Sequence, residues 1–180
     1  MKKTVLTFGI ISGVIVTVLM GITTLFADRI GFDRAVIVGY TSMLVAFLLV
    51  FFGIKSYRDN IGNGEISFGR AFKVGILITL ITCVFYVVSW QVLYYTVLSD
   101  FPEQYGNYLV EKARAAGATA EQLAQEREKV KEMKALLDNP LLGPAVIFIS
   151  EPLPVGLVMT LISAAILRKR RREVEVPATP

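Results

Sequence analysis

The stretch TVLTFGIISGVIVTVLMGITTLFA, residues 4–27, decides the fold, because none of its 24 residues is charged. At about 1.5 Å of rise per residue, a helix of this length crosses a hydrocarbon core of about 30 Å. A secretory signal peptide is the competing interpretation, since Lys2 and Lys3 precede the stretch, but the apolar part is longer than a usual h-region. The stretch therefore predicts a first transmembrane helix.

Three more apolar stretches follow, and the composition agrees with them, because 54% of the 180 residues are hydrophobic. The uncharged run 74–98 ends in aromatic residues of the type that favours membrane interfaces. Glu151-Pro152-Leu153-Pro154 interrupts the last run, so its helix is expected to begin late and to leave 141–150 as an interfacial segment. We predict an all-α integral membrane four-helix bundle with spans at about 4–27, 35–54, 74–98 and 146–167.

Residues 99–139 are charged and helix-favouring, which predicts a helical excursion outside the membrane between the third and fourth spans. Gly117 divides this excursion. Thr119-Ala120-Glu121-Gln122 then has the form in which the two end side chains cap a new helix. This excursion is expected either to offer its apolar stripe to a partner or to fold back on the bundle. The stripe is formed by Leu123, Val130, Met133 and Leu137.

Lysine and arginine gather at one set of span ends, which predicts the orientation. The N-terminus, the second connector and the basic C-terminal tail 168–180 carry eleven such residues near the membrane. The first connector is balanced in charge, and 99–139 has six basic and eight acidic residues. By the positive-inside rule, we expect a multi-pass protein of the inner (cytoplasmic) membrane with both termini cytoplasmic and an extracytoplasmic excursion.

Small residues recur at four-residue intervals on the first and fourth predicted spans. A helix face without bulky side chains lets another helix approach closely. We expect these faces to pack inside the bundle, with a homodimer interface as the alternative. The candidate packing residues are Gly9, Gly13, Thr17 and Gly21 on the first span, and Gly156, Thr160 and Ala164 on the fourth.

Glu151 is the one formal charge inside an apolar run, and a charged group at membrane depth is costly. A carboxylate near a helix N-terminus is favoured by the helix dipole, so Glu151 is expected to be a capping or interfacial group paired with Arg29 or Arg34. A proton or cation site is the alternative, and its candidate residues are Glu151, Gln91 and Thr82. Polar side chains of the third span could line a solute pathway or bond their own and neighbouring helices; they are Thr79, Thr82, Tyr86, Ser89, Gln91 and Tyr94.

Basic and aromatic side chains flank the third and fourth spans on the expected cytoplasmic side. Such side chains anchor helices at lipid phosphates, and a docking surface for a cytoplasmic partner is the alternative. The candidates are Phe68, Arg70, Phe72 and Lys73 before the third span, and Arg168, Lys169 and Arg170 after the fourth.

The residue types of the chain exclude several kinds of chemistry. There is no histidine and one cysteine, Cys83, so a histidine-based triad, a thiolate zinc cluster and an intrachain disulfide are excluded. No phosphate-binding loop and no nucleic-acid motif is present in the sequence. We therefore expect a protein that is not an enzyme, holds no cofactor and binds no nucleic acid.

The stretch GEISFGRAFKVG, residues 64–75, resembles the segment before the third span in the domain of unknown function 4199 family, a family of bacterial four-span membrane proteins. The charged excursion and the closing basic cluster are similar to that family as well. The resemblance covers nearly the whole chain. It implies a four-span membrane fold and no particular activity, ligand or catalytic residue.

These observations lead to two hypotheses about function. The first is a non-enzymatic interaction or envelope-support component of the membrane. The second is a small channel or transporter for ions or small solutes that uses the third span and Glu151. The expected partners are membrane lipids, a second copy of the chain and an unidentified protein.

Overall fold

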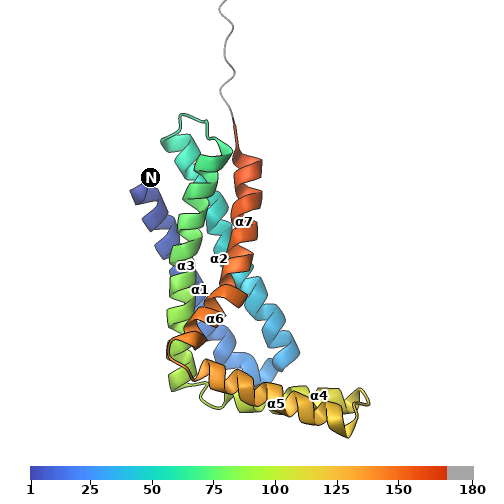
Figure 1. Cartoon of the computed structure of the whole chain (residues 1–180). Coiled ribbons are helices and arrows are strands. Elements are labelled where there is room, and N and C mark those ends of the chain that lie inside the picture. The colour runs from blue at the N-terminus through green and yellow to red at the C-terminus, as the bar shows by residue number, and fades with distance from the viewer. Residues whose placement is uncertain (170–180) are drawn as a thin grey trace, which may run out of the picture.

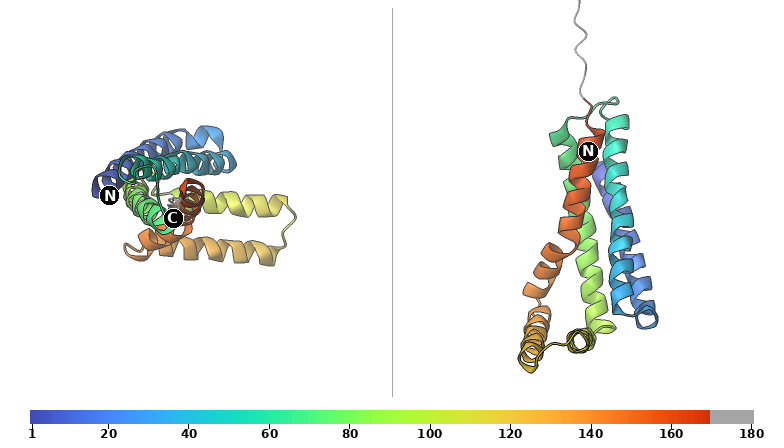
Figure 2. Two further views of the ribbon diagram at one scale, coloured as in Figure 1. Left: turned by 90° about the horizontal axis from the view of Figure 1, so that it is seen from above. Right: turned by 90° about the vertical axis from the view of Figure 1, so that its right-hand side faces the viewer.

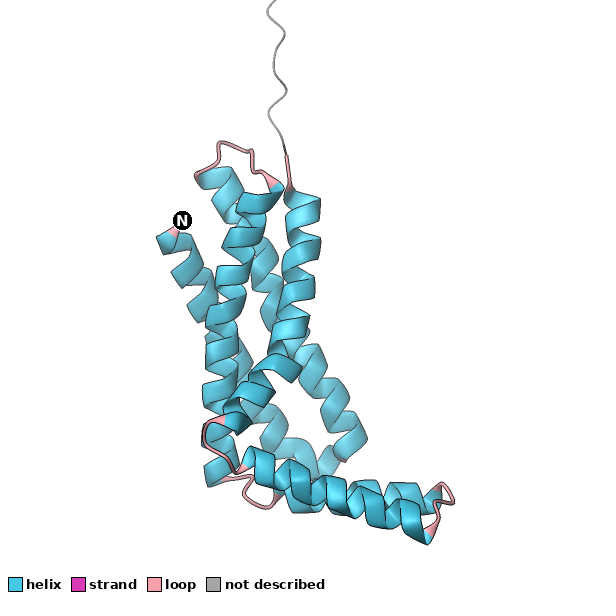
Figure 3. Ribbon diagram, viewed as in Figure 1, coloured by secondary structure: helices cyan, strands magenta, loops and turns pink. Residues whose placement is uncertain are grey.

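Seven α-helices account for most of residues 1–169, which are the residues that this computed structural model describes (Figures 1 and 3). Within these residues the β-structure is limited to one isolated bridge, between Ile66 and Lys169. Most of the predicted tail 168–180, Arg170 included, lies outside the described residues. The helices are α1 (Lys2–Ile30), α2 (Phe32–Asn60), α3 (Phe68–Thr96), α4 (Phe101–Ala115), α5 (Ala120–Leu137), α6 (Leu142–Ser150) and α7 (Pro152–Leu167).

Four segments are long and apolar enough to cross a membrane: α1, α2, α3 and the consecutive pair α6–α7. This confirms the predicted all-α membrane bundle. The helices extend past the predicted spans because the backbone remains helical through the charged residues at the span ends, as in α2, which continues to Asn60.

The structure adds detail at the start of the fourth span. Leu142–Ser150 forms helix α6 and, together with α7, makes up one candidate span, whereas the interfacial position expected for 141–150 stays a prediction. The helical axis breaks at Glu151, since Pro152 and Pro154 have no N–H to donate to the carbonyls of Phe148 and Ser150. Proline therefore divides this apolar segment into two helices.

Helix α3 occupies the centre of the bundle (Figure 2). It packs against α1, α2, α6 and α7, while α2 contacts both α1 and α7. The core between these helices includes Phe47 and Ile54 of α2, Ile78 of α3 and Ala164 of α7, all fully buried. Many large apolar side chains face outward instead, as a lipid-exposed protein requires; Leu25, Ile37, Val84 and Ile149 are each more than half exposed.

Hydroxyl groups join the spanning helices to one another. Ser12 of α1 donates to the carbonyl of Ala46 in α2 at 2.8 Å. The hydroxyls of Thr17 and Ser89 lie 2.7 Å apart between α1 and α3, and those of Thr79 and Thr160 lie 2.9 Å apart between α3 and α7. Such bonds satisfy polar groups that would otherwise be exposed to lipid.

Helices α4 and α5 form an antiparallel hairpin that lies crosswise at one end of the bundle (Figures 1 and 2). The predicted cap at the start of α5 is present, since the Thr119 hydroxyl accepts from the Gln122 N–H while the Gln122 side chain accepts from the Thr119 N–H. Gly117, at φ +85°, makes the turn between the two helices.

The apolar stripe of α5 folds back on its own chain. Val130 packs against Gly106 of α4 so closely that a Cβ built on Gly106 would lie 2.2 Å from a Val130 methyl group. Met133 and Leu137 join Tyr94 and Ile147 in a second apolar cluster beside the bundle. Internal packing is thus what the structure shows for Val130, Met133 and Leu137 of the stripe.

Candidate functional site

The break between α6 and α7 places the Glu151 carboxylate inside the fourth span. Glu151 is half-buried, and its N–H still donates to the carbonyl of Ile147 at 3.1 Å. Pro152 follows it as the first residue of α7, a position that suits proline because the N–H there has no partner within the helix. A carboxylate, two prolines and interrupted backbone hydrogen bonding thus meet at one level of the bundle.

Tyr86 of α3 is the partner of this carboxylate. Its hydroxyl donates to Glu151 Oε2 at 2.5 Å and joins the third and fourth spans at the break. The predicted pairing with Arg29 or Arg34 is wrong, because neither forms an ion pair with Glu151 among the described residues. Arg29 lies at the end of α1 and Arg34 at the start of α2, whereas Glu151 lies between α6 and α7.

The other two candidates for this polar site are placed differently. Thr82 is buried and donates to the carbonyl of Ile78 in its own helix at 3.1 Å. Gln91 is half-buried, more than one helical turn beyond Tyr86. The structure therefore pairs Glu151 with Tyr86 rather than with Thr82 or Gln91.

The other hydroxyls predicted for the polar face of α3 also bond to protein groups. Thr79 bonds to Thr160 and to the Gly156 carbonyl, Ser89 bonds to Thr17, and Tyr94 donates to Asp138 Oδ1 at 2.6 Å. Among the side chains that the structure describes, every buried nitrogen and oxygen has a hydrogen-bond partner. This arrangement is typical of helix packing.

The small residues predicted for packing mostly face neighbouring helices. A Cβ on Gly9 would lie 2.9 Å from Ile81, and one on Gly13 would lie 2.4 Å from Phe85, both in α3. Gly156, Thr160 and Ala164 are buried where α7 meets α2 and α3. Gly21 differs, because a Cβ there would have no neighbour within 4 Å.

An aromatic cluster attaches the hairpin to the start of α2. The ring of Phe32 lies 6.3 Å from that of Phe101, 5.6 Å from that of Tyr105 and 5.2 Å from that of Tyr108, measured between centroids. Aromatic pairs at such distances add to the free energy of burial. The cluster therefore connects α4 to a helix that is distant in the sequence.

An ion pair lies beside this aromatic cluster. Lys112 Nζ is 2.8 Å from Asp33 Oδ1 and also donates to the Tyr108 hydroxyl at 3.1 Å. The neighbouring Asp33 carboxylate and Tyr108 hydroxyl raise the pKa of Lys112 above its ordinary value. Because the pair is exposed, we expect it to orient the hairpin more than to stabilise it.

Replacing Phe32 with alanine is expected to release the hairpin while leaving the bundle folded. The substitution removes the aromatic contacts to α4 and retains the Lys112–Asp33 pair, which is weak in water. Spin labels at Gln125 and Lys55 should then report a broader distance distribution, with an unchanged thermal midpoint of the bundle. The matched control is Phe52→Ala, an exposed phenylalanine of the same helix. An unchanged distribution in Phe32→Ala would show that other contacts hold the hairpin.

The residues predicted to contact lipid or a partner lie at the end of the bundle that is opposite to the hairpin. Phe68 and Phe72 stack with their ring centroids 6.3 Å apart at the start of α3. The Ser67 hydroxyl caps this helix by accepting from the N–H of Arg70. The basic side chains of this set that the structure describes are all exposed: Arg70, Lys73, Arg168 and Lys169.

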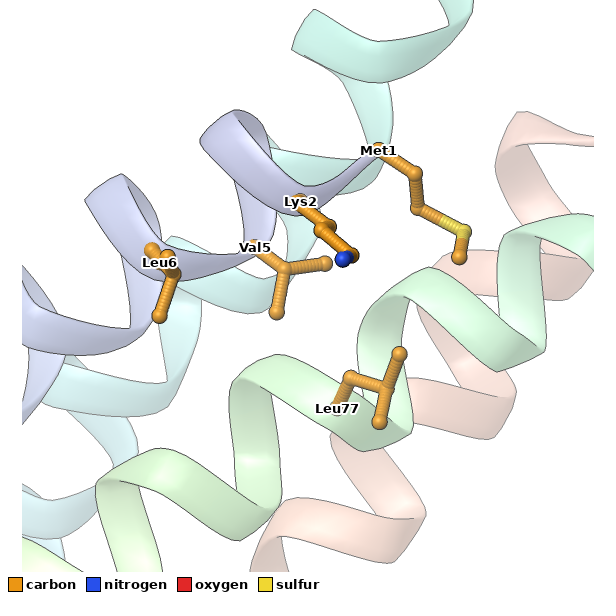
Figure 4. A pocket seen from close by; sticks show the side chains of 5 residues that line it. All are labelled: Met1, Lys2, Val5, Leu6 and Leu77. Carbon is orange, nitrogen blue, oxygen red and sulfur yellow. The ribbon is translucent and has the colours of Figure 1, made fainter.

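A shallow recess of about 250 Å³ lies on the surface between α1 and α3 near the N-terminus (Figure 4). Lys2 is the one residue with a polar side chain among those that line it, and the rest of the lining is apolar. Ligand sites combine apolar walls with several convergent polar groups. The recess lacks such groups, so the candidate sites remain the Tyr86–Glu151 pair, the hairpin and the basic end.

Comparison with known proteins identifies one family. Residues 7–169 match the family model described as "Protein of unknown function (DUF4199)". The match includes all four candidate spans for most of their length, and the hairpin. No curated protein and no solved structure matches the chain.

Proposed function

The chain belongs to the DUF4199 family, whose description assigns no activity, and from its architecture we propose a non-enzymatic support or interaction role in the bacterial cell envelope. In this proposal the bundle is an anchor in the inner membrane. The hairpin α4–α5 is a fixed platform that another envelope component binds on the extracytoplasmic side. The absence of histidine from the sequence supports the non-enzymatic part.

The two ends of the bundle differ in charge, which supports this orientation. The end that holds 1–3, 55–73 and 168–169 carries eight basic and two acidic residues. The end that holds 28–34 and 99–139 carries eight basic and ten acidic residues. The positive-inside rule assigns the first end to the cytoplasm and the hairpin to the outer side.

The attachment of the hairpin at both of its helices is the observation that carries the proposal. Asp138, just after α5, accepts from Tyr94 of α3, while α4 packs against Phe32 of α2. A helix pair held at two separate points presents one defined surface. Since the apolar stripe of α5 is covered, that surface is charged, and it includes Glu121, Glu128, Lys129 and Glu132, all exposed.

A photo-crosslinking residue at exposed Gln125 tests this proposal in living cells. The expected result is a protein adduct that disappears when Glu128 and Glu132 are both replaced by lysine, because the contact is made through the charged face. The same probe at Asn63, an exposed residue at the other end of the bundle, is the matched control. Adducts with lipid or with the chain itself alone, or the same adduct from both positions, would contradict the proposal.

A proton or cation pathway is the second candidate function, and Glu151 is the observation that favours it. Carboxylates at membrane depth often bind the transported ion, and helices interrupted within the membrane frequently form such sites. Reconstituted protein should then carry a flux of protons or sodium ions that Glu151→Gln abolishes. Equal flux in the wild-type and Glu151→Gln proteins, at the level of empty liposomes, would leave Glu151 with a packing role only.

A further inference from the structure

An isolated β-bridge closes the end of the bundle near the N-terminus. The N–H of Ile66 donates to the Lys169 carbonyl at 3.1 Å, and the N–H of Lys169 donates to the Ile66 carbonyl at 2.9 Å. The Ile66 side chain is buried in the apolar core together with that of Leu167. The bridge therefore fixes the end of α7 beside the loop between α2 and α3.

This connection brings basic residues of α2 and of the chain after α7 together. Lys55 and Arg58 lie in the last two turns of α2, and the bridge holds Lys169 beside the loop that follows this helix. Arg58 forms an ion pair with Asp59 at 2.7 Å, whereas Lys55, Arg168 and Lys169 form none within residues 1–169. Because Asp59 is paired with Arg58, these three exposed basic side chains have no anionic partner among the described residues.

Other charges of this end reinforce the excess of positive charge. Arg70 and Lys73 lie in the first two turns of α3, and Glu65 in the preceding loop is the second acid of this end. Phe68 is 41% exposed and stacks on Phe72. Exposed aromatic and basic side chains side by side are typical of the headgroup level of a bilayer.

We propose that this end of the bundle binds the headgroup of an anionic phospholipid. Lys55, Arg168 and Lys169 meet the lipid phosphate, while Phe68 lies against the acyl chains. The bridge between Ile66 and Lys169 holds the two basic segments at a fixed separation, so they act on one headgroup. Positive charge near an anionic bilayer attracts it, by about fivefold in binding constant for each lysine or arginine.

Lipid binding can be tested directly with the whole chain in uncharged detergent micelles. Binding there does not depend on how the protein is oriented in a cell membrane. Retention of phosphatidylglycerol is compared with retention of phosphatidylcholine by mass spectrometry of the intact complex. The wild type should prefer phosphatidylglycerol. The variant Lys55→Gln/Arg168→Gln/Lys169→Gln should lose about fivefold in affinity for each charge removed.

Two controls make the result specific. Arg127→Gln/Lys131→Gln/Lys134→Gln makes the same change in charge on the hairpin and should retain the preference. Glycerol phosphate in solution should not displace the lipid, since it lacks acyl chains. Equal retention of the two lipids, an equal loss in both triple variants, or displacement by glycerol phosphate would overturn the proposal. The substituted residues are exposed, and an unchanged thermal midpoint verifies that each variant is folded.

Discussion

Gly156→Leu is expected to lower the free energy of unfolding of the bundle by about 3 kcal/mol, at the high end of the usual range for overpacking. A Cβ at this position would lie 2.4 Å from Thr79 Cγ2 and 2.7 Å from Phe47 Cε1. Both neighbours are fully buried, so neither can move into lipid. The larger side chain would also separate α7 from the Thr79 hydroxyl, which donates to the Gly156 carbonyl at 3.3 Å.

The same substitution at Gly21 provides the matched control. Gly21 also lies within a spanning helix, but a Cβ there would meet nothing within 4 Å. Leucine favours the helix more than glycine does, so Gly21→Leu should leave stability unchanged or slightly raised. Unfolding of the reconstituted proteins with increasing dodecyl sulfate, monitored by circular dichroism, measures both variants. Equal midpoints for Gly156→Leu and Gly21→Leu would show that the contact at Gly156 is not tightly packed.

Tyr86→Phe should produce the second large effect, a loss of about 1 to 3 kcal/mol in unfolding free energy. The substitution removes one oxygen atom, and it leaves the Glu151 carboxylate without the hydrogen bond that the structure gives it. Glu151→Gln should cost less, because the amide oxygen still accepts from the Tyr86 hydroxyl. Loss of the hydrogen bond should therefore lower the unfolding free energy more than loss of the charge does.

A double-mutant cycle separates this interaction from general loss of packing. The variant Tyr86→Phe/Glu151→Leu removes both polar partners, so it should be more stable than Tyr86→Phe alone. Dodecyl sulfate unfolding of the four proteins in the cycle gives the coupling free energy. Additive effects of the two substitutions would mean that the two side chains do not interact in the folded protein.

The four spans could be predicted from the sequence because each depends on a local property. Residues 4–27 contain no charge, and a helix is the usual way for such a stretch to satisfy its backbone in lipid. Family membership was likewise recognisable from residues 64–75 and the order of the spans, and the family match over residues 7–169 confirms it. Periodicity also placed the α5 stripe on one helix face.

The contacts between helices could not be predicted, since they depend on how the helices are rotated and spaced. Tyr86 and Glu151 are 65 residues apart, and no local pattern pairs them. Gly21 continues the four-residue spacing of Gly9 and Gly13, but spacing does not reveal where a neighbouring helix diverges. The α5 stripe is covered because α4 presents Gly106 opposite Val130, a register that neither helix specifies alone.

We propose that the chain crosses the membrane four times, with the hairpin on the opposite side from both termini. Single cysteines at Gln125 and Asn63, introduced after Cys83→Ala, test it with a maleimide that cannot cross the inner membrane. In spheroplasts we expect labelling at Gln125→Cys, and labelling at Asn63→Cys only after lysis. Labelling of both positions before lysis, or of Asn63→Cys alone, would contradict this topology.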